Sequence, residues 1–263
     1  MTIAHLSDVH FGRIAYPEIV DVLVGEVNAR GVDLVVISGD LTQRARRKQF
    51  RAAVAMLQSF EAPTLVVPGN HDVYAWWHRP FLRVFHPVRR YRQYVTDNLR
   101  PTFEQDGVAV LGINSAHGLT IKGGRIRAPE RACIETFFPG TGDGVFNVLV
   151  VHHHLTWIEA VGKHDVARQG RETFDAALRA GVDLVLCGHL HVSHVEPFQA
   201  PSGRRIVIAA AGTATSNRSR ESQSRANYYN VIEVGPASFS IEERRYAPEA
   251  QRFKPERRTR FER

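Results

Sequence analysis

The chain has 263 residues, of which 43% are hydrophobic and 23% charged, and its formal net charge is +7. This size fits one large domain or two small ones, and the apolar fraction is high enough for a sizeable core. The opening residues lack the pattern of a secretory leader, and the longest apolar runs are too short to span a bilayer. Two cysteines give no disulfide framework, so we expect a cytoplasmic setting.

The basic balance favours anionic partners such as phosphates, nucleic acid or acidic lipid. Much of the excess positive charge lies in residues 244–263, where proline and charged residues dominate. We expect residues 1–245 to form a single domain. Residues 246–263 are expected to form a basic, solvated C-terminal tail and are a candidate for disorder.

Short apolar runs alternate with amphipathic stretches along the body of the chain. The runs predict strands over residues 3–6, 33–37, 64–67, 108–113, 148–151, 183–186, 205–210, 228–234 and 238–243. The amphipathic stretches predict helices over residues 17–30, 48–59, 129–138 and 171–180. This alternation is typical of a layered α/β domain. The last three strands have no long helices between them, so part of the sheet should be antiparallel.

Two segments of the chain echo each other. Residues 31–40, "GVDLVVISGD", and residues 181–189, "GVDLVLCGH", both continue from a helix end through an apolar strand to a residue that can bind metal. They are either equivalent units of two packed halves, or they are alike by chance because many helix-to-strand connections have similar sequence patterns.

Five of the predicted strands are followed at once by side chains that can bind metal. These are Asp8 and His10, then Asp40, then Asn70, His71 and Asp72, then His152, His153 and His154, and finally His189 and His191. Ligands of open α/β sheets gather at the carboxyl ends of the strands, so we expect these side chains to converge. Burying so many polar groups without a cation would cost about 1–3 kcal/mol for each unpaired group.

A metal centre would remove that cost. The Asp-x-His and His-x-His spacings place two side chains on the same side of an extended segment. Mixed His, Asp and Asn ligands suit manganese, iron, zinc or cobalt, and they are too many for one tetrahedral zinc. The number of ligands indicates two divalent or trivalent ions about 3.5–4 Å apart that share a carboxylate.

The ordered motifs "DVH", "GDLTQ", "GNHD", "HHH" and "GHLH" span residues 8–191 and resemble those of calcineurin-like metallophosphoesterases. "HLSDVHFG", "VVPGNHD" and "GHLHVS" are most similar to the bacterial branch that includes cyclic-nucleotide phosphodiesterases, although DNA-repair nucleases of the family carry similar blocks. The resemblance implies the metallo-dependent phosphatase fold. In that fold, two mixed β-sheets flanked by helices form a four-layer αββα sandwich.

The resemblance also implies a ligand set for each ion. One ion would be held by Asp8, His10, Asp40 and His191, and the other by Asp40, Asn70, His152 and His189, with Asp40 as the bridge. Family members usually have His-His-Pro where this chain has three histidines and Leu155, so His153 is the rival of His152 as ligand.

The resemblance further implies roles around the ions. His71 would lie next to the substrate phosphate, stabilising it or protonating the leaving oxygen, and Asp72 could orient His71. His154 would either contact substrate or form a hydrogen bond with nearby backbone.

Residues 73–94 are rich in aromatic and basic side chains. They predict either an amphipathic helical excursion that covers the sheet or a wall of the cleft that stacks a base and contacts phosphate. In the second case Trp76 and Trp77 bind substrate. The basic segment 217–225 is either a solvated loop or a contact for an anionic substrate.

The motifs favour a two-metal-dependent phosphoesterase, in particular a phosphodiesterase for a small substrate with a cyclic nucleotide as one candidate. A metal-bridging hydroxide would attack phosphorus in line, so no protein nucleophile is required. One alternative is a nuclease of the same superfamily, which the basic charge favours but the short chain after "GHLH" disfavours. The other is a non-catalytic scaffold, which the intact ligand positions disfavour. The sequence fixes neither the metal, the physiological substrate nor the oligomeric state.

Overall fold

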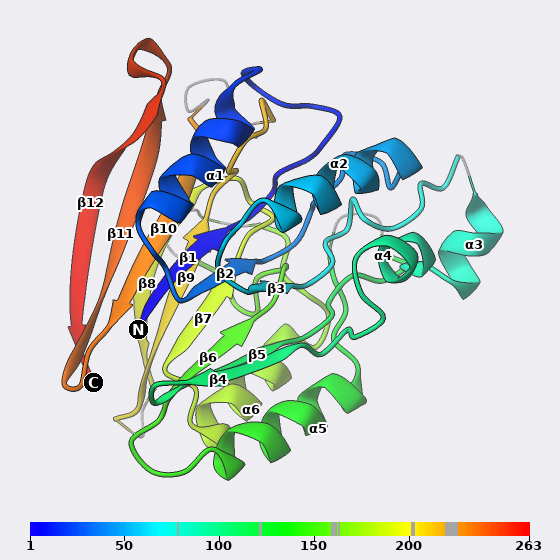
Figure 1. Cartoon of the computed structure of the whole chain (residues 1–263). Coiled ribbons are helices and arrows are strands. Elements are labelled where there is room, and N and C mark those ends of the chain that lie inside the picture. The colour runs from blue at the N-terminus through cyan, green and yellow to red at the C-terminus, as the bar shows by residue number, and fades with distance from the viewer. Residues whose placement is uncertain (78, 121–122, 159–161, 163, 201–202, 219–225) are drawn as a thin grey trace.

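Two β-sheets lie face to face in the computed structural model, and helices cover both outer faces (Figure 1). The structure describes residues 1–77, 79–120, 123–158, 162, 164–200, 203–218 and 226–263. Within these ranges, no helix is both long and apolar enough to cross a membrane.

The first sheet has the strand order β12-β11-β10-β1-β2-β3. Its strands are β1 (Thr2–Leu6), β2 (Leu34–Ile37), β3 (Thr64–Val66), β10 (Tyr228–Val234), β11 (Ser238–Ala247) and β12 (Arg252–Glu262). The neighbours β1, β2 and β3 are parallel, whereas β10, β11 and β12 join β1 as an antiparallel extension.

The second sheet has the strand order β4-β5-β6-β7-β9-β8. Its strands are β4 (Thr102–Gln105), β5 (Val108–Gly112), β6 (Phe146–Val150), β7 (Leu184–Cys187), β8 (Ser193–Gln199) and β9 (Arg205–Ala211). The four inner strands are parallel, and an antiparallel strand closes each edge.

Helices form the two outer layers. The helices are α1 (Ile19–Ala29), α2 (Arg47–Gln58), α3 (Pro80–Phe85), α4 (Arg89–Tyr94), α5 (Ala128–Phe137) and α6 (Gly170–Ala180), with 3-10 turns η1 (Phe138–Gly140) and η3 (Pro248–Ala250). Apolar side chains of α1 and α2 pack on the first sheet, and those of α5 and α6 pack on the second. A third core joins the two sheets, so the predicted four-layer αββα sandwich is confirmed.

Strands buried on both faces explain the nearly continuous apolar runs of the sequence. In β2, Leu34 and Val36 enter the core between the sheets, while Val35 and Ile37 pack under the helices. Successive side chains of a strand point to opposite faces, so both faces must be apolar when both are covered.

The parallel strands of both sheets bring their carboxyl ends to one edge of the sandwich. The echoing segments 31–40 and 181–189 contain β2 of the first sheet and β7 of the second. Each strand is flanked by parallel neighbours and follows a helix. The two stretches therefore hold corresponding places in the two packed halves.

The C-terminal expectation is wrong. Residues 252–262 form β12, which pairs with β11 along its whole length and is not a disordered tail. Phe253 is buried in the core on the α1 side of the sheet, and Phe261 is buried in the core between the two sheets, while most of the basic residues between them are exposed. Because few positions of an edge strand need to be apolar, the many charged residues and the proline of this segment did not give the apolar pattern that predicts a strand. The edge strands β4 and β8 were missed for the same reason.

The expectation that part of the sheet is antiparallel is confirmed: β10 and β11 pair antiparallel, and β9 pairs antiparallel with β8 and parallel with β7. Segment 73–94 is only partly a cover for the sheet. Tyr91 of α4 is buried and donates a hydrogen bond to the carbonyl of Val66 at 2.9 Å. Phe81 and Phe85 of α3 are 79% and 71% exposed. Residue 78 and most of the basic segment 217–225, namely 219–225, lie outside the described residues.

Candidate metal centre

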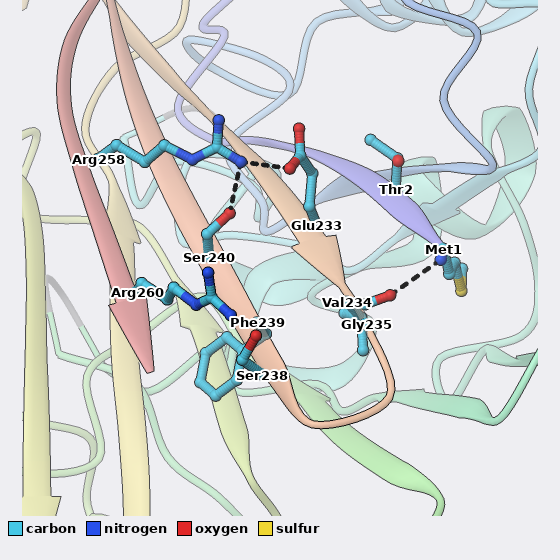
Figure 2. Close-up of a pocket in the computed structure, with 10 residues that line it drawn as sticks. All are labelled: Met1, Thr2, Glu233, Val234, Gly235, Ser238, Phe239, Ser240, Arg258 and Arg260. Atoms are coloured by element: carbon cyan, nitrogen blue, oxygen red, sulfur yellow. Dashed lines mark hydrogen bonds and ion pairs between the residues drawn. The ribbon is translucent and has the colours of Figure 1, made fainter. Parts of the chain in front are cut away.

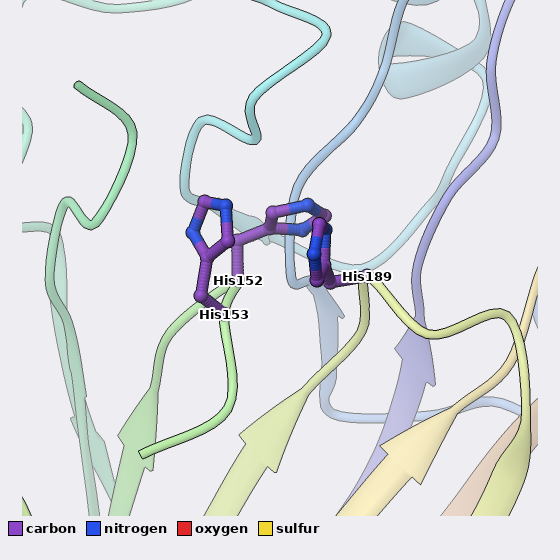
Figure 3. A group of neighbouring side chains, drawn as sticks. All are labelled: His152, His153 and His189. Atoms are coloured by element: carbon purple, nitrogen blue, oxygen red, sulfur yellow. The ribbon is translucent and has the colours of Figure 1, made fainter. Parts of the chain in front are cut away.

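The loops that follow β1, β2, β3, β6 and β7 meet at the carboxyl edge of the sandwich. They bring together side chains that are distant in sequence, and Figure 3 shows His152, at the end of β6, beside His189, at the end of β7. The described residues include three groups of metal-capable atoms, each within 4.8 Å of one another. They are Asp8, His10 and His191; Asp8, Asp40 and His152; and His152, His153 and His189.

The first predicted ligand set is assembled around Asp8. Its Oδ1 atom lies 3.0 Å from Nε2 of His191 and 3.4 Å from Nε2 of His10. The two Nε2 atoms are themselves 3.1 Å apart, and Oδ2 of Asp40 lies 3.7 Å from Nε2 of His10. Ligands about 2.0–2.2 Å from one ion are separated by roughly 3–3.6 Å, so these spacings fit a shared cation.

The second predicted ligand set shares Asp40 with the first. Oδ2 of Asp40 lies 3.4 Å from Nε2 of His152. Oδ1 of Asn70 lies 3.1 Å from that same nitrogen and 3.0 Å from Nδ1 of His189. Since Oδ2 of Asp40 faces both groups, the arrangement is that of a candidate binuclear centre with a bridging carboxylate.

Backbone carbonyls orient two of the imidazoles from behind. Nδ1 of His152 lies 2.7 Å from the carbonyl of Ser38, and Nδ1 of His191 lies 2.9 Å from the carbonyl of Arg218. A carbonyl can only accept, so Nδ1 carries the proton and the Nε2 lone pair points into the centre. Such outer contacts are typical of metal-binding histidines.

The backbone of the centre is strained. Asp8, His10, Asp40, His189 and His191 all have φ between 53° and 70°, in the left-handed region that side chains other than glycine rarely adopt. Such conformations cost on the order of 1–3 kcal/mol each and cluster at functional sites. The tight turns direct successive ligands inward from short loops.

A glycine lets two of the loops approach each other. A Cβ atom on Gly69 would lie 2.1 Å from Oδ1 of Asp40 and 2.4 Å from its backbone nitrogen. Any other residue there would displace the bridging carboxylate. The glycine of "GNHD" is therefore required by the close packing of the β3 loop on Asp40.

Charge in the centre is unbalanced without a cation. Among the described residues, Asp8 Oδ1 and His10 Nδ1 are buried without a hydrogen-bond partner, although the first lies close to two imidazoles. Burial raises the pKa of Asp8, but the facing His191 and His10 outweigh it and hold that pKa well below its usual range. Burial lowers the pKa of His152, but Asp40 outweighs it and raises that pKa to about 9. Carboxylates, imidazoles and an amide oxygen with unsatisfied atoms fit two divalent ions.

The three consecutive histidines have three different environments, and Figure 3 shows the first two of them, His152 and His153, with His189. His152 faces Asp40 and Asn70. Nδ1 of His153 lies 2.8 Å from the hydroxyl of Ser115, and its ring packs 4.6 Å from that of His189. His152 therefore occupies the predicted ligand position more closely than its rival His153 does.

His154 does not lie in a substrate cleft, so its expected substrate contact is wrong. Its side chain is 1% exposed, and Nε2 donates to the carbonyl of Gly188 at 3.0 Å. Burial lowers the pKa of His154 to about 3, which keeps the ring neutral. His154 therefore holds the loop after β7 through this hydrogen bond to backbone, which was the other role expected for it.

His71 lies at the rim of the centre. Its ring packs edge-on against His10 at 4.9 Å, and its Nδ1 lies 2.8 Å from the carbonyl of Gln43. Its Nε2 lies 2.6 Å from Nη1 of Arg218. Nδ1 therefore donates to Gln43, and Nε2 accepts from Arg218, which requires a neutral ring.

Asp72 does not orient the ring of His71, contrary to expectation. Its carboxylate accepts hydrogen bonds from the backbone nitrogens of Leu41, Thr42 and Gly69 and from the Thr42 hydroxyl. Burial, with Asp40 nearby, raises the pKa of Asp72 to about 7. Asp72 thus ties the loop after β3 to the loop that carries Asp40.

A cleft of about 320 Å³ opens beside the centre, next to Asn70 and His71. Its other lining residues include Trp76 and Trp77, the two predicted substrate contacts, and four arginines, Arg13, Arg44, Arg83 and Arg218. Sequence reasoning did not single out these arginines. They come from four separate parts of the chain, so no sequence motif joins them, and only the basic composition of their segments pointed to an anion-binding role.

A larger hollow of about 450 Å³ lies near the amino end of β1, away from the centre (Figure 2). Three of its charged groups are already paired. Arg258 forms an ion pair with Glu233, and the amino group of Met1 donates to the carbonyl of Val234 at 3.1 Å. No group of metal-capable side chains among the described residues lies there. The chemistry is concentrated at the carboxyl edge.

Comparisons with known proteins agree with this geometry. The sequence profile of calcineurin-like phosphoesterases matches residues 1–193. A metallophosphoesterase of Helicobacter pylori is 26% identical over 195 residues, which are 73% of this chain and 45% of the relative. The glycerophosphodiester phosphodiesterase GpdQ of Enterobacter lignolyticus is 26% identical over 207 residues, which are 73% of this chain and 71% of that enzyme. The chain thus spans less than half of the Helicobacter relative.

Solved structures share the fold at low sequence identity. A purple acid phosphatase from yellow lupin has a TM-score of 0.76 and 10% identity, and the match covers 100% of this chain and 53% of that one. A Vps29 variant from Entamoeba histolytica has a TM-score of 0.52 and 14% identity, with 99% of both chains covered. The profile match over most of the sequence and the shared sandwich show that the chain belongs to the calcineurin-like phosphoesterase family.

Proposed function

We propose that this protein is a two-metal phosphodiesterase that hydrolyses a small phosphodiester. The observation that carries the proposal is the arrangement of Asp40 between two sets of facing ligand atoms. Similarity to GpdQ, which is named as a glycerophosphodiester phosphodiesterase, supports a diester substrate. The motif blocks shared with cyclic-nucleotide phosphodiesterases make a cyclic nucleotide one candidate.

In this proposal each ion has four protein ligands. Asp8, His10, Asp40 and His191 hold the first, and Asp40, Asn70, His152 and His189 hold the second. Divalent ions bound there would neutralise phosphoryl oxygens and lower the pKa of water towards about 7. Manganese, iron, zinc and cobalt all suit this ligand set.

The protein itself positions the substrate. His71 and Arg218 line the cleft at the rim of the centre, where the phosphate of a bound diester would lie. Nη1 of Arg218 donates to Nε2 of His71, and because a guanidinium carries five N–H donors, Arg218 can also donate to a phosphoryl oxygen. Preorganised donors aimed at developing negative charge stabilise the transition state.

The aromatic wall gives the cleft its non-ionic contacts. The side chain of Trp77 is 76% exposed, and the Arg44 guanidinium lies 4.9 Å from the centre of its ring. We propose that Trp76 and Trp77 contact the organic part of the substrate. Base stacking on an aromatic side chain contributes about 1–3 kcal/mol.

The test is a turnover assay of the manganese-loaded protein. The substrates are bis-p-nitrophenyl phosphate, p-nitrophenyl phosphate, 2′,3′- and 3′,5′-cyclic nucleotides, and single-stranded DNA. We expect diester turnover that is lost in Asp40→Ala. Cleavage of DNA without turnover of any small diester would replace this proposal with a nuclease. Metal binding without turnover of any substrate would replace it with a non-catalytic scaffold.

A further inference from the structure

Four arginines line the cleft beside the metal centre, and one of them differs from the others. Arg83 is buried and donates to the carbonyls of Tyr74, Gly118 and Thr120. These three contacts use its guanidinium to hold loops together. The remaining three, Arg13, Arg44 and Arg218, also line the cleft. Among the described residues, none of their guanidinium groups donates to a backbone carbonyl.

These three arginines form no ion pair with a carboxylate among the described residues. Nε of Arg13 donates to Oδ1 of Asn217 at 3.0 Å, Arg44 lies over the ring of Trp77, and Arg218 donates to His71. Every one of these partners is uncharged. Three like charges around one hollow repel each other, so their placement favours an anion between them.

Arg218 is fixed at the inner end of the cleft. Its segment is held to the loop after β1 by hydrogen bonds from Asn217 to the Arg13 carbonyl and from Ala15 to the Thr215 carbonyl. Its own carbonyl lies 2.9 Å from Nδ1 of His191, and its Nη1 lies 2.6 Å from Nε2 of His71. Arg218 therefore reaches the reacting phosphate, whereas Arg13 and Arg44 are exposed and lie towards solvent.

The charge of a single phosphodiester group does not balance the summed charge of the metal centre and the three cleft arginines. Asp8 and Asp40 contribute two negative charges against the four positive charges of two divalent ions. Three arginines raise the excess to about five positive charges, and one diester group carries only one negative charge. The outer arginines thus match negative charge on another part of the substrate.

We propose that Arg13 and Arg44 form a second anion subsite, which selects phosphodiesters whose nucleoside part carries an additional phosphate. The inference rests on the proposed function. In this arrangement the scissile phosphate lies at the metal centre and Arg218, the base lies against Trp76 or Trp77, and the further phosphate lies between Arg13 and Arg44. Trp76 and Trp77 both line the cleft together with these arginines.

A matched pair of chromogenic substrates tests the subsite. Thymidine 5′-(p-nitrophenyl phosphate) and the same compound with a 3′-phosphate differ in one anionic group and release the same leaving group. We expect the manganese-loaded protein to prefer the 3′-phosphorylated compound at least tenfold in kcat/KM, since charge-assisted hydrogen bonds discriminate by such factors. A ratio near one would overturn the inference.

Variants locate the preference. We expect the double variant Arg13→Gln, Arg44→Gln to bring the ratio close to one through a higher KM for the 3′-phosphorylated substrate. Arg51→Gln removes the same charge from an exposed position on α2 outside the cleft and should leave the ratio as it is. A ratio that survives the double variant would contradict the subsite.

A binding experiment separates this inference from the proposed function. Calorimetry with thymidine 3′,5′-bisphosphate and thymidine 5′-phosphate needs no turnover. We expect the bisphosphate to bind at least tenfold more tightly and to lose that advantage in the double variant. If no diester is hydrolysed but the advantage is present, the proposed function fails and the subsite stands. If bis-p-nitrophenyl phosphate is hydrolysed without any advantage, the subsite alone fails.

Discussion

Two buried polar clusters in this protein have opposite electrostatic balance. Between α1 and the C-terminal strands, Glu26 accepts hydrogen bonds from Arg244 Nε at 2.7 Å and from the Tyr229 hydroxyl at 2.6 Å. The same Arg244 pairs with Glu242 and donates to the carbonyl of Phe253. Arg30 also lies 3.6 Å from Glu26 and 4.0 Å from Glu242, so two guanidinium groups face two carboxylates and this cluster is balanced within the chain.

The cluster at the carboxyl ends of the strands is not balanced in this way. Nε2 of His10 faces Nε2 of His191 at 3.1 Å, and Asp8 Oδ1 is buried without a hydrogen bond to any residue that the structure describes. Its backbone is strained at five of the predicted ligands. The contrast separates a network that stabilises the fold from one that is complete only with bound cations.

The largest effect should come from removing the bridging charge. Asp40→Asn keeps the shape of the side chain but loses the shared carboxylate, so we expect kcat/KM for bis-p-nitrophenyl phosphate to fall by about 10³-fold or more. Elemental analysis should find less manganese in the variant. Asp175→Asn, at an exposed ion pair on α6, is the control and should retain full activity. Equal activity of Asp40→Asn and the parent would refute the bridging role.

Breaking the balanced cluster should affect stability and not chemistry. Arg244→Ala removes the nearest cation of Glu26, which keeps only its longer contact with Arg30, so we expect the free energy of unfolding to fall by about 3 kcal/mol. Urea denaturation measures this, and manganese content and kcat of the folded variant should match those of the parent. Arg30→Ala removes a more exposed ion pair and should cost less than about 1 kcal/mol. A similar cost for both variants would contradict the comparison.

Bound metal should stabilise the folded protein only through the cluster at the carboxyl ends of the strands. A ligand at 100 times its Kd adds about 2.7 kcal/mol, and 1 kcal/mol corresponds to roughly 2–4 °C for a chain of this size. We therefore expect manganese to raise Tm by at least about 5 °C and a chelator to reverse the shift. The increment should persist in Arg244→Ala and shrink in Asp40→Asn. A shift that is equal in all three proteins would show that the ion binds elsewhere.

The smallest effect concerns backbone strain away from the centre. Gln251, in the turn before β12, has φ of 45°. Glycine adopts this conformation without the Cβ penalty, so Gln251→Gly should stabilise the protein by about 0.5 kcal/mol after its own entropic cost. Activity should not change. A clear loss of stability in urea denaturation would mean that strain at this turn is already relieved by other contacts.

The inner strands and all the metal-capable side chains were predictable from the sequence, because both depend on local patterns. Strands buried on both faces are marked by runs such as 34–37, and each ligand follows directly after such a run. The four-layer order and the ligand sets came from the resemblance of the ordered motifs. The positions of these side chains at the strand ends, without the resemblance, indicated that they converge in one site and that the site holds two ions.

What the sequence could not predict depends on contacts between distant segments. The strand β12 is defined by its pairing with β11 and by the burial of Phe253 and Phe261, which its charged composition conceals. The role of Arg218 depends on a meeting with His71, 147 positions away in the sequence. For His154 the sequence left a substrate contact and a backbone hydrogen bond open, and for Asp72 the resemblance implied contact with His71; both side chains form hydrogen bonds with backbone.

The most direct test of the central claim is a crystal structure of the manganese-loaded protein with anomalous diffraction at the manganese edge. We predict two peaks about 3.5–4 Å apart, one beside Asp8 and His191 and one beside Asn70 and His189, with Asp40 between them. A single peak, or peaks at any other place in the molecule, would contradict the account.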